Sequence, residues 1–202
     1  HHFYFGGNQN ESFLGPSWFH LKTLNQKNSQ QSSLPTRETW WSRKKETLLE
    51  FCNGKTPMYL YDRETIEERV SELKSLQSID KVHYALKSNS FPPLVRLMDQ
   101  LGLGFDCVSW GEITFLRQTL GENFDAKKVL FPPSFAPIKE YEEAFKLGSL
   151  VTLDNLYPLK QFPQTFRHQK ILCRIDPGVG GGHHKFVKTA GSQSKFGISL
   201  DD

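Results

Sequence analysis

A repeating strand-then-helix unit is the feature of this 202-residue sequence that most constrains its fold. Short apolar runs typical of strands alternate with segments whose apolar residues recur at helical spacing. The expected strands are 81–87, 105–108, 129–131, 150–153, 171–175 and 195–198. Because strands separated by helices pair in parallel through right-handed crossovers, the pattern predicts an α/β fold built on a parallel sheet.

The segments between these strands carry residues that begin helices. Asp62 is expected to cap one helix through its carboxylate. Ser109 and Glu112 have the spacing of a capping box, so Glu112 has a structural role and is not nominated as an acid or base. Pro92 and Pro137 fit the first turn of two further helices. Ahead of this region, we expect a short helix over 39–51 and a short strand over 56–61.

Composition excludes several classes of partner. The net charge of +3 is small and unclustered, which gives no case for nucleic acid or an anionic membrane surface. No apolar run is long enough to span a bilayer. The three cysteines, Cys52, Cys107 and Cys173, form no CxxC pair, and with no secretory segment at the start we expect a reducing cytoplasm. The histidines have no metal-ligand spacing, so we expect no metal site.

A lysine closes the first of the six expected strands. Bulky residues there alternate with a second set: Val82, Tyr84 and Leu86 against His83, Ala85 and Lys87. In a barrel strand one set faces the helices and the other faces the axis. We expect Lys87 to lie inward at the carboxyl end of its strand, where parallel barrels keep their chemistry. Burial there favours the neutral amine, which can form a Schiff base with an aldehyde such as pyridoxal phosphate. The alternative is a solvated lysine on an edge strand.

Four ordered motifs resemble those of one enzyme family. They are YALKSN from Tyr84, GFDCVSWGE from Gly104, RIDPG from Arg174 and SKFGI from Ser194. Together they resemble the pyridoxal-phosphate decarboxylases with an alanine-racemase-type barrel, which act on diaminopimelate, ornithine and arginine. The segment 182–191 ahead of SKFG points to diaminopimelate decarboxylase, most like the form fused behind an aspartate kinase.

The resemblance implies a fold and a division of the chain. The fold would be a (β/α)8 TIM-type barrel of the alanine racemase and decarboxylase type, incomplete at the C-terminus. Residues 1–36 would be a linker or the tail of a preceding domain, such as aspartate kinase. Residues 37–62 would hold a helix and a strand leading into the decarboxylase. Residues 63–202 would be a partial pyridoxal-phosphate-binding barrel.

The resemblance also implies an activity. The chain would be the N-terminal part of an enzyme that decarboxylates meso-2,6-diaminopimelate to L-lysine, with pyridoxal 5'-phosphate as cofactor and a small amino acid as substrate. That enzyme would be a cytoplasmic homodimer, and residues 1–202 alone would be inactive. Two alternatives remain open: an ornithine or arginine decarboxylase, and a non-catalytic pyridoxal-phosphate-binding barrel or inactive fragment.

The family assigns roles to residues that match its motifs. Lys87 would be the catalytic residue and would hold the cofactor covalently. Asp106 and Arg174 would lie near the cofactor ring at the ends of two strands, and each could be the other's charge partner. A purely structural ion pair between them is the alternative. The resemblance places His183, His184 and Ser194 near the substrate.

Overall fold

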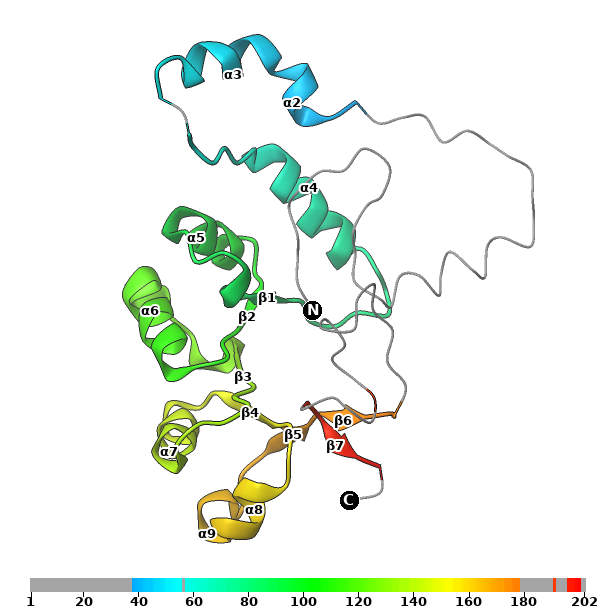
Figure 1. Cartoon of the computed structure of the whole chain (residues 1–202), viewed down its shortest axis with the longest axis vertical. Coiled ribbons are helices and arrows are strands. Elements are labelled where there is room, and N and C mark those ends of the chain that lie inside the picture. Colours follow the sequence, from blue (N-terminus) through cyan, green and yellow to red (C-terminus); the bar gives the residue numbers. More distant parts are fainter. Residues whose placement is uncertain (1–37, 56, 179–190, 192–195, 201–202) are drawn as a thin grey trace, which may run out of the picture. The chain divides into compact units, whose positions relative to one another are not determined.

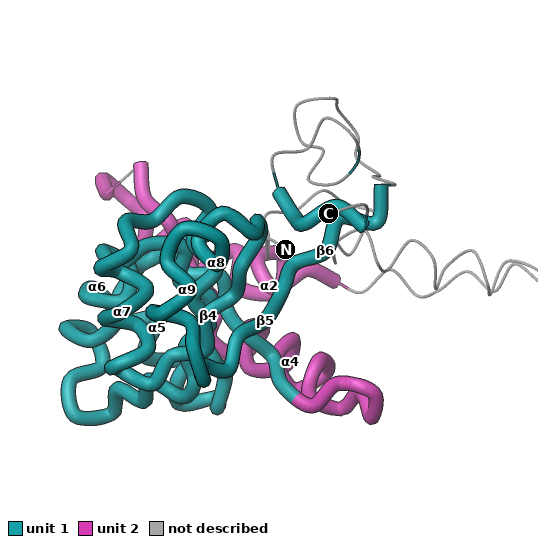
Figure 2. The backbone as a smooth tube through the Cα atoms, turned by 90° about the horizontal axis from the view of Figure 1, so that it is seen from below, with its two compact units in different colours: residues 1–23, 81–202 teal, residues 24–80 magenta. Residues whose placement is uncertain are grey.

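The computed structural model describes residues 38–55, 57–178, 191 and 196–200. The chain divides into two compact units (Figure 2). One comprises residues 24–80, and the other comprises residues 1–23 together with 81–202. The predicted boundaries at 36 and 62 remain predictions, and the predicted linker or domain tail over 1–36 lies outside the described residues.

The larger unit contains the parallel sheet that the sequence predicts. Its five hydrogen-bonded strands run β1 (His83–Ala85), β2 (Gly104–Asp106), β3 (Val129–Phe131), β4 (Leu150–Leu153) and β5 (Ile171–Cys173) in chain order. All four neighbouring pairs are parallel. A separate parallel pair, β6 (Ile175–Asp176) and β7 (Ile198–Ser199), follows β5. Parallel pairs in chain order require one crossover between successive strands, as in a barrel wall.

Helices fill the crossovers of this sheet. They are α5 (Pro92–Gln100), α6 (Trp110–Leu120), α7 (Ile138–Leu147), α8 (Tyr157–Gln161) and α9 (Pro163–Phe166), with short 3-10 turns η1 (Leu86–Ser88), η2 (Gly121–Asn123) and η3 (Ala126–Lys128). These five α-helices lie on one face of the five-stranded sheet (Figure 1). Ser109 caps α6 as predicted, and α5 and α7 begin at or next to Pro92 and Pro137.

The helix-covered face of the sheet forms the core. Parallel register puts Tyr84 opposite Phe105, and Phe131 opposite Val151. All four side chains are buried. The Tyr84 and Phe105 rings meet edge-on with centroids 6.5 Å apart, and the Phe131 ring meets Tyr141 of α7 at 6.2 Å. Burying each large side chain contributes about 1.5–3 kcal/mol, so this face holds the sheet to its helices.

On the opposite face of the sheet, the side chains of β1 and β2 are smaller or more polar. By alternation it presents His83, Ala85, Gly104 and Asp106 from β1 and β2. Leu172 of β5, on the same face, is 39% exposed. This is the face that would line the axis of a closed barrel. The described strands form an open sheet rather than a closed ring.

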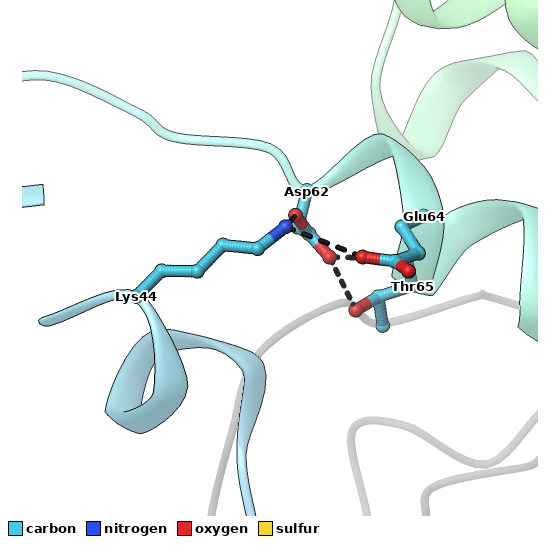
Figure 3. A network of polar contacts seen from close by, with 4 residues as sticks. All are labelled: Lys44, Asp62, Glu64 and Thr65. Carbon is cyan, nitrogen blue, oxygen red and sulfur yellow. Dashed lines mark hydrogen bonds and ion pairs between the residues drawn. The ribbon is translucent and has the colours of Figure 1, made fainter. Parts of the chain in front are cut away.

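The smaller unit contains α2 (Trp40–Arg43), α3 (Lys45–Cys52) and α4 (Arg63–Lys74). Asp62 caps α4 as predicted, accepting hydrogen bonds from the Thr65 nitrogen (3.1 Å) and hydroxyl (2.6 Å). Lys44 Nζ lies 2.5 Å from Asp62 Oδ1 and 3.4 Å from Glu64 Oε2 (Figure 3). The ammonium and the Thr65 groups hold the pKa of Asp62 down to about 2. The start of α4 is therefore both capped and ion-paired.

Two sequence expectations for this unit are wrong. The helix expected over 39–51 is broken at Lys44, whose φ of −106° and ψ of 17° interrupt the helical backbone. No strand forms over residues 57–61, because none of the described strands pairs with this segment, and Tyr59 is 90% exposed. Within the described part of the chain, no helix has both the length and the apolar character that a membrane span requires.

Candidate functional site

Lys87 lies at the carboxyl end of β1, but not in the strand. The expected strand over 81–87 ends at Ala85, and Leu86–Ser88 form the 3-10 turn η1. The Ser88 hydroxyl donates to the Ala85 carbonyl at 2.7 Å and closes this turn. The Tyr84 hydroxyl donates to the Asn89 carbonyl at 2.9 Å and fixes the segment that follows. Lys87 is exposed, so the burial expected for its amine is not provided by the described residues.

Asp106 ends β2 on the sheet face opposite the helices, paired in register with Ala85. Its Oδ1 atom is buried and has no hydrogen-bond partner among the described residues. Burial raises the pKa of Asp106, while the positive charge of Lys87 lowers it. A buried carboxylate oxygen without a donor is costly, which makes Asp106 a position that a cationic or hydrogen-bonding ligand group would stabilise.

Glu112 forms the predicted capping box in a slightly extended form. Its backbone nitrogen donates to Ser109 Oγ at 3.2 Å, and its own Oε2 accepts from the Val108 nitrogen at 2.7 Å. Burial raises the pKa of Glu112, the Val108 N–H bond opposes that shift, and the nearby charge of Asp106 adds to it. Glu112 is therefore a structural carboxylate, and the charge of Asp106 acts on it.

Arg174 does not pair with Asp106. It lies between β5 and β6, so the single strand expected over 171–175 is interrupted there. Its backbone nitrogen donates to the Leu153 carbonyl and its carbonyl accepts from the Ile198 nitrogen, both at 2.7 Å. The guanidinium carbon sits 4.7 Å from the centroid of the Phe196 ring. This cation–π contact replaces the predicted ion pair, and Arg174 is the weakest of the side-chain charges that lower the pKa of Asp106.

The other predicted site residues, His183, His184 and Ser194, lie outside the described residues. Among the residues that are described, no group of three or more His, Cys, Asp or Glu side chains is arranged to hold a metal ion. One residue of the site was not nominated from sequence: His83, half-buried on the same sheet face as Asp106. Its place in the alternating set with Ala85 and Lys87 was the signal that could have identified it.

The described residues fit a ligand that carries an aldehyde. Lys87 offers a primary amine at the open carboxyl edge of the sheet, and Asp106 offers a buried oxygen that lacks a donor. Nucleophilic lysines form covalent adducts with carbonyl groups, and a carboxylate nearby stabilises a cationic nitrogen. The arrangement is therefore suited to covalent capture of an aldehyde with an adjacent positive charge.

Known proteins agree with this chemistry. Residues 63–202 match the family model described as pyridoxal-dependent decarboxylase, pyridoxal binding domain. Diaminopimelate decarboxylase of Helicobacter pylori is 31% identical over 155 residues, 73% of this chain and 38% of that protein. The Bacteroides thetaiotaomicron enzyme of the same name is 29% identical over 162 residues, 75% of this chain and 41% of that protein.

Solved structures agree as well. The crystal structure of Helicobacter pylori diaminopimelate decarboxylase complexed with L-lysine superposes with a TM-score of 0.64 and 26% identity, covering 77% of this chain and 40% of that one. Arginine decarboxylase of Paramecium bursaria Chlorella virus, bound to agmatine, has a TM-score of 0.63 at 22% identity, covering 79% and 41%, and supports the fold alone. The chain spans about two fifths of the length of these relatives. With most of its length matched by the family model, the chain belongs to the pyridoxal-dependent decarboxylases, a family whose cofactor is pyridoxal phosphate.

Proposed function

We propose that this chain is the pyridoxal-binding part of an enzyme that decarboxylates meso-2,6-diaminopimelate to L-lysine. The observation that carries the proposal is the placement of Lys87 after β1 at the carboxyl edge of a parallel sheet, where its charge acts on Asp106, whose Oδ1 has no hydrogen-bond partner among the described residues. The similarity of the chain to several diaminopimelate decarboxylases supports the choice of substrate.

Each of these two residues has a part in the proposed reaction. Lys87 would hold the cofactor through Nζ and would regain its free amine when the substrate binds. Asp106 orients the bound ligand by accepting a hydrogen bond at Oδ1. Pyridoxal phosphate, when bound, supplies an electron-withdrawing ring that accepts the electrons left as carbon dioxide departs. The reaction breaks one bond between Cα and a carboxylate and requires one proton at that carbon.

Covalent trapping tests the role of Lys87. Incubation of the chain with pyridoxal phosphate, borohydride reduction and peptide mapping should place the pyridoxyl group on Lys87. Reduction records even a short-lived adduct, so trapping does not depend on tight binding. Lys87→Ala should abolish the label on this peptide. Because Lys87 is exposed, the variant should change the free energy of unfolding by no more than about 0.5 kcal/mol.

Lys81→Ala is the matched control, because Lys81 is exposed and precedes the same strand. It should leave the labelling of Lys87 unchanged. A pyridoxyl group spread over several surface lysines, or concentrated on another lysine, would contradict the proposal. The substrate is tested by carbon dioxide release from diaminopimelate, ornithine and arginine in an active enzyme that contains this chain. Preference for ornithine or arginine would replace the proposed substrate.

The proposed function includes an oligomeric state and a cellular location. The resemblance predicts a cytoplasmic homodimer with a small amino acid as its substrate. Sedimentation of the active protein would distinguish a dimer from a monomer, and a monomer that decarboxylates at full rate would contradict the dimer.

A further inference from the structure

The imidazole of His83 packs against Gly104. The two residues face each other across the β1–β2 pair, on the sheet face opposite the helices. A Cβ atom at position 104 would lie 2.6 Å from His83 Nε2 and 2.7 Å from the Lys128 carbonyl oxygen. Since these distances are far below van der Waals contact, only glycine leaves room for the imidazole here. The missing side chain at 104 therefore leaves the space that the His83 ring occupies.

In this register, His83 is a diagonal neighbour of Asp106 on the same face of the sheet. Ala85 is opposite Asp106 in the register, and His83 is opposite Gly104, two residues before Asp106 on the same strand face. Diagonal neighbours of this kind are about 7–8 Å apart and can interact through long side chains. Lys87 follows Ala85 toward the carboxyl edge. Asp106 thus follows His83 along the sheet face and precedes the turn that carries Lys87, and the charges of both residues act on it.

We propose that His83 is a positioning residue for Asp106, and that its protonation draws the Asp106 carboxylate away from the cofactor lysine, Lys87. This inference rests on the proposed role of Lys87. With neutral His83, the Asp106 oxygen is available to the Lys87 side of the site. With protonated His83, two cations compete for one carboxylate. Capture of pyridoxal phosphate would then weaken as His83 gains its proton.

The charges around His83 support this competition. Burial lowers the pKa of His83, Asp106 raises it, and Lys81 on its own strand segment lowers it. On η3, the Lys128 backbone carbonyl lies beside Gly104, and the Lys128 ammonium is engaged with Asp99 at 3.0 Å. Among the described residues, Asp106 is accordingly the anion that acts on His83. Burial raises the pKa of Asp106, and the charges of Lys87 and His83 oppose that shift.

The first test measures the electrostatic coupling between His83 and Asp106 in the absence of cofactor. The imidazole titrations of the chain's seven histidines can be followed by NMR, and the signal lost in His83→Asn identifies His83. Asp106→Asn should shift the His83 midpoint to lower pH, because the nearby negative charge is gone. Asp176→Asn, a carboxylate on β6, should leave the midpoint unchanged. A His83 midpoint that is the same in wild type and Asp106→Asn overturns the proposal.

The second test measures how His83 protonation affects the capture of pyridoxal phosphate by Lys87. Borohydride trapping of pyridoxal phosphate on Lys87 is compared between wild type and His83→Asn from about pH 5 to 8, the range in which histidine titrates. Lower pH reduces trapping by any amine in both proteins, so the informative quantity is the ratio of the wild-type yield to the variant yield. This ratio should fall as pH drops through the His83 midpoint. A constant ratio overturns the proposal, even where the coupling is found.

Failure of the proposed function is distinguishable from failure of this inference. If Lys87 is not labelled in any protein at any pH, the role of Lys87 is wrong, and the consequence drawn for cofactor capture falls with it. The NMR comparison still decides whether His83 and Asp106 are coupled. If His83→Asn does not fold, His83→Gln takes its place, both to identify the His83 signal and to compare trapping.

Discussion

A Cβ atom at Gly197 would lie 2.8 Å from the backbone nitrogen of Asp176 and 3.0 Å from its Cβ. This close approach joins the two short strands β6 and β7, in which Ile175 is opposite Ile198. The Asp176 side chain reinforces the junction by accepting hydrogen bonds from the nitrogens of Gly178 (3.0 Å) and Gly191 (2.9 Å). The glycine of the SKFG motif is therefore required by packing as well as by its φ of +89°.

Gly197→Ala should destabilise the protein by about 1–3 kcal/mol, because the alanine both adopts a strained positive φ and collides with backbone that cannot move away. Gly148→Ala is the matched control, since Gly148 has nearly the same φ, +88°, but no atom within 4 Å of an added Cβ. Chemical denaturation of the two variants measures the difference. An equal loss of unfolding free energy in both would show that only the backbone angle matters at Gly197.

Asp62→Ala should shorten or fray α4 and cost about 1 kcal/mol at neutral pH, because the helix loses its N-cap. The pKa of Asp62 is about 2 in the folded protein, below its unfolded value of about 3.9. A carboxyl group with a lowered folded pKa stabilises the fold above its unfolded pKa, and this stabilisation is lost as pH falls through the folded value. The gap between wild type and Asp62→Ala should therefore shrink between about pH 4 and pH 2.

Glu64→Gln separates the cap from the surrounding charges. Glu64 is exposed and lies 3.4 Å from Lys44 Nζ, so its loss should change the unfolding free energy by less than about 0.5 kcal/mol. Helix content followed by circular dichroism during urea unfolding compares the two variants. A larger loss in Glu64→Gln than in Asp62→Ala would contradict the capping argument.

Local sequence signals predicted the scaffold well, because local contacts determine it. The Asp62 cap and the Ser109–Glu112 box depend on residues three positions apart, and both are formed. The parallel strand order follows from alternation of strands with helices, and it is confirmed. The end of β1 was predicted two residues too late, since hydrophobic alternation continues through Lys87 while the Ser88 hydroxyl turns the backbone at Ala85.

The site was less predictable, because its contacts join residues far apart in the chain. Arg174 was expected to face Asp106, but its guanidinium stacks on Phe196, and no local pattern indicates that choice. The seating of His83 on Gly104 depends on strand register, which the sequence does not specify by itself. The roles of Lys87 and Asp106 came from the resemblance to known decarboxylases, and remain to be tested by labelling.

The two cysteines of the larger unit should differ sharply in reactivity. Cys107 is fully buried, and burial raises the pKa of its thiol, so little thiolate forms. Cys173 ends β5 and is exposed. A maleimide added to the native protein should label Cys173 and spare Cys107, as read by peptide mapping. In urea, which exposes both thiols, the labelling rates should become similar.

Cys173→Ser provides the check on this cysteine comparison. The variant should lose the native label of the larger unit and retain slow labelling of Cys107 that follows unfolding. Rapid modification of Cys107 in the native variant would mean that β2 is not packed beneath α5 and α6.

Asp106→Asn should weaken pyridoxal phosphate binding more than Asp176→Asn does. Asp106 supplies a buried oxygen that no described residue hydrogen-bonds, whereas the oxygens of Asp176 accept hydrogen bonds from the Gly178 and Gly191 nitrogens. The yield of pyridoxyl-Lys87 against cofactor concentration compares the two variants. Equal weakening would remove the reason for assigning Asp106 to the cofactor.

Although Asp106→Asn should weaken cofactor binding, it should not lower the stability of the fold at neutral pH. Burial raises the pKa of Asp106 in the folded protein, so folding favours its protonated form. A group with a raised folded pKa gives its full stabilisation below the unfolded pKa, about 3.9, and loses it as pH rises through the folded value. At neutral pH the charged, buried carboxylate, whose Oδ1 accepts no hydrogen bond from the described residues, therefore destabilises the fold, and Asp106→Asn should be at least as stable as wild type. That advantage should disappear as pH falls toward 4, and thermal unfolding at pH 7 and pH 4 measures it. An Asp106→Asn protein that is less stable than wild type at pH 7 would show that the carboxylate has a stabilising partner, and its proposed availability to a ligand would be wrong.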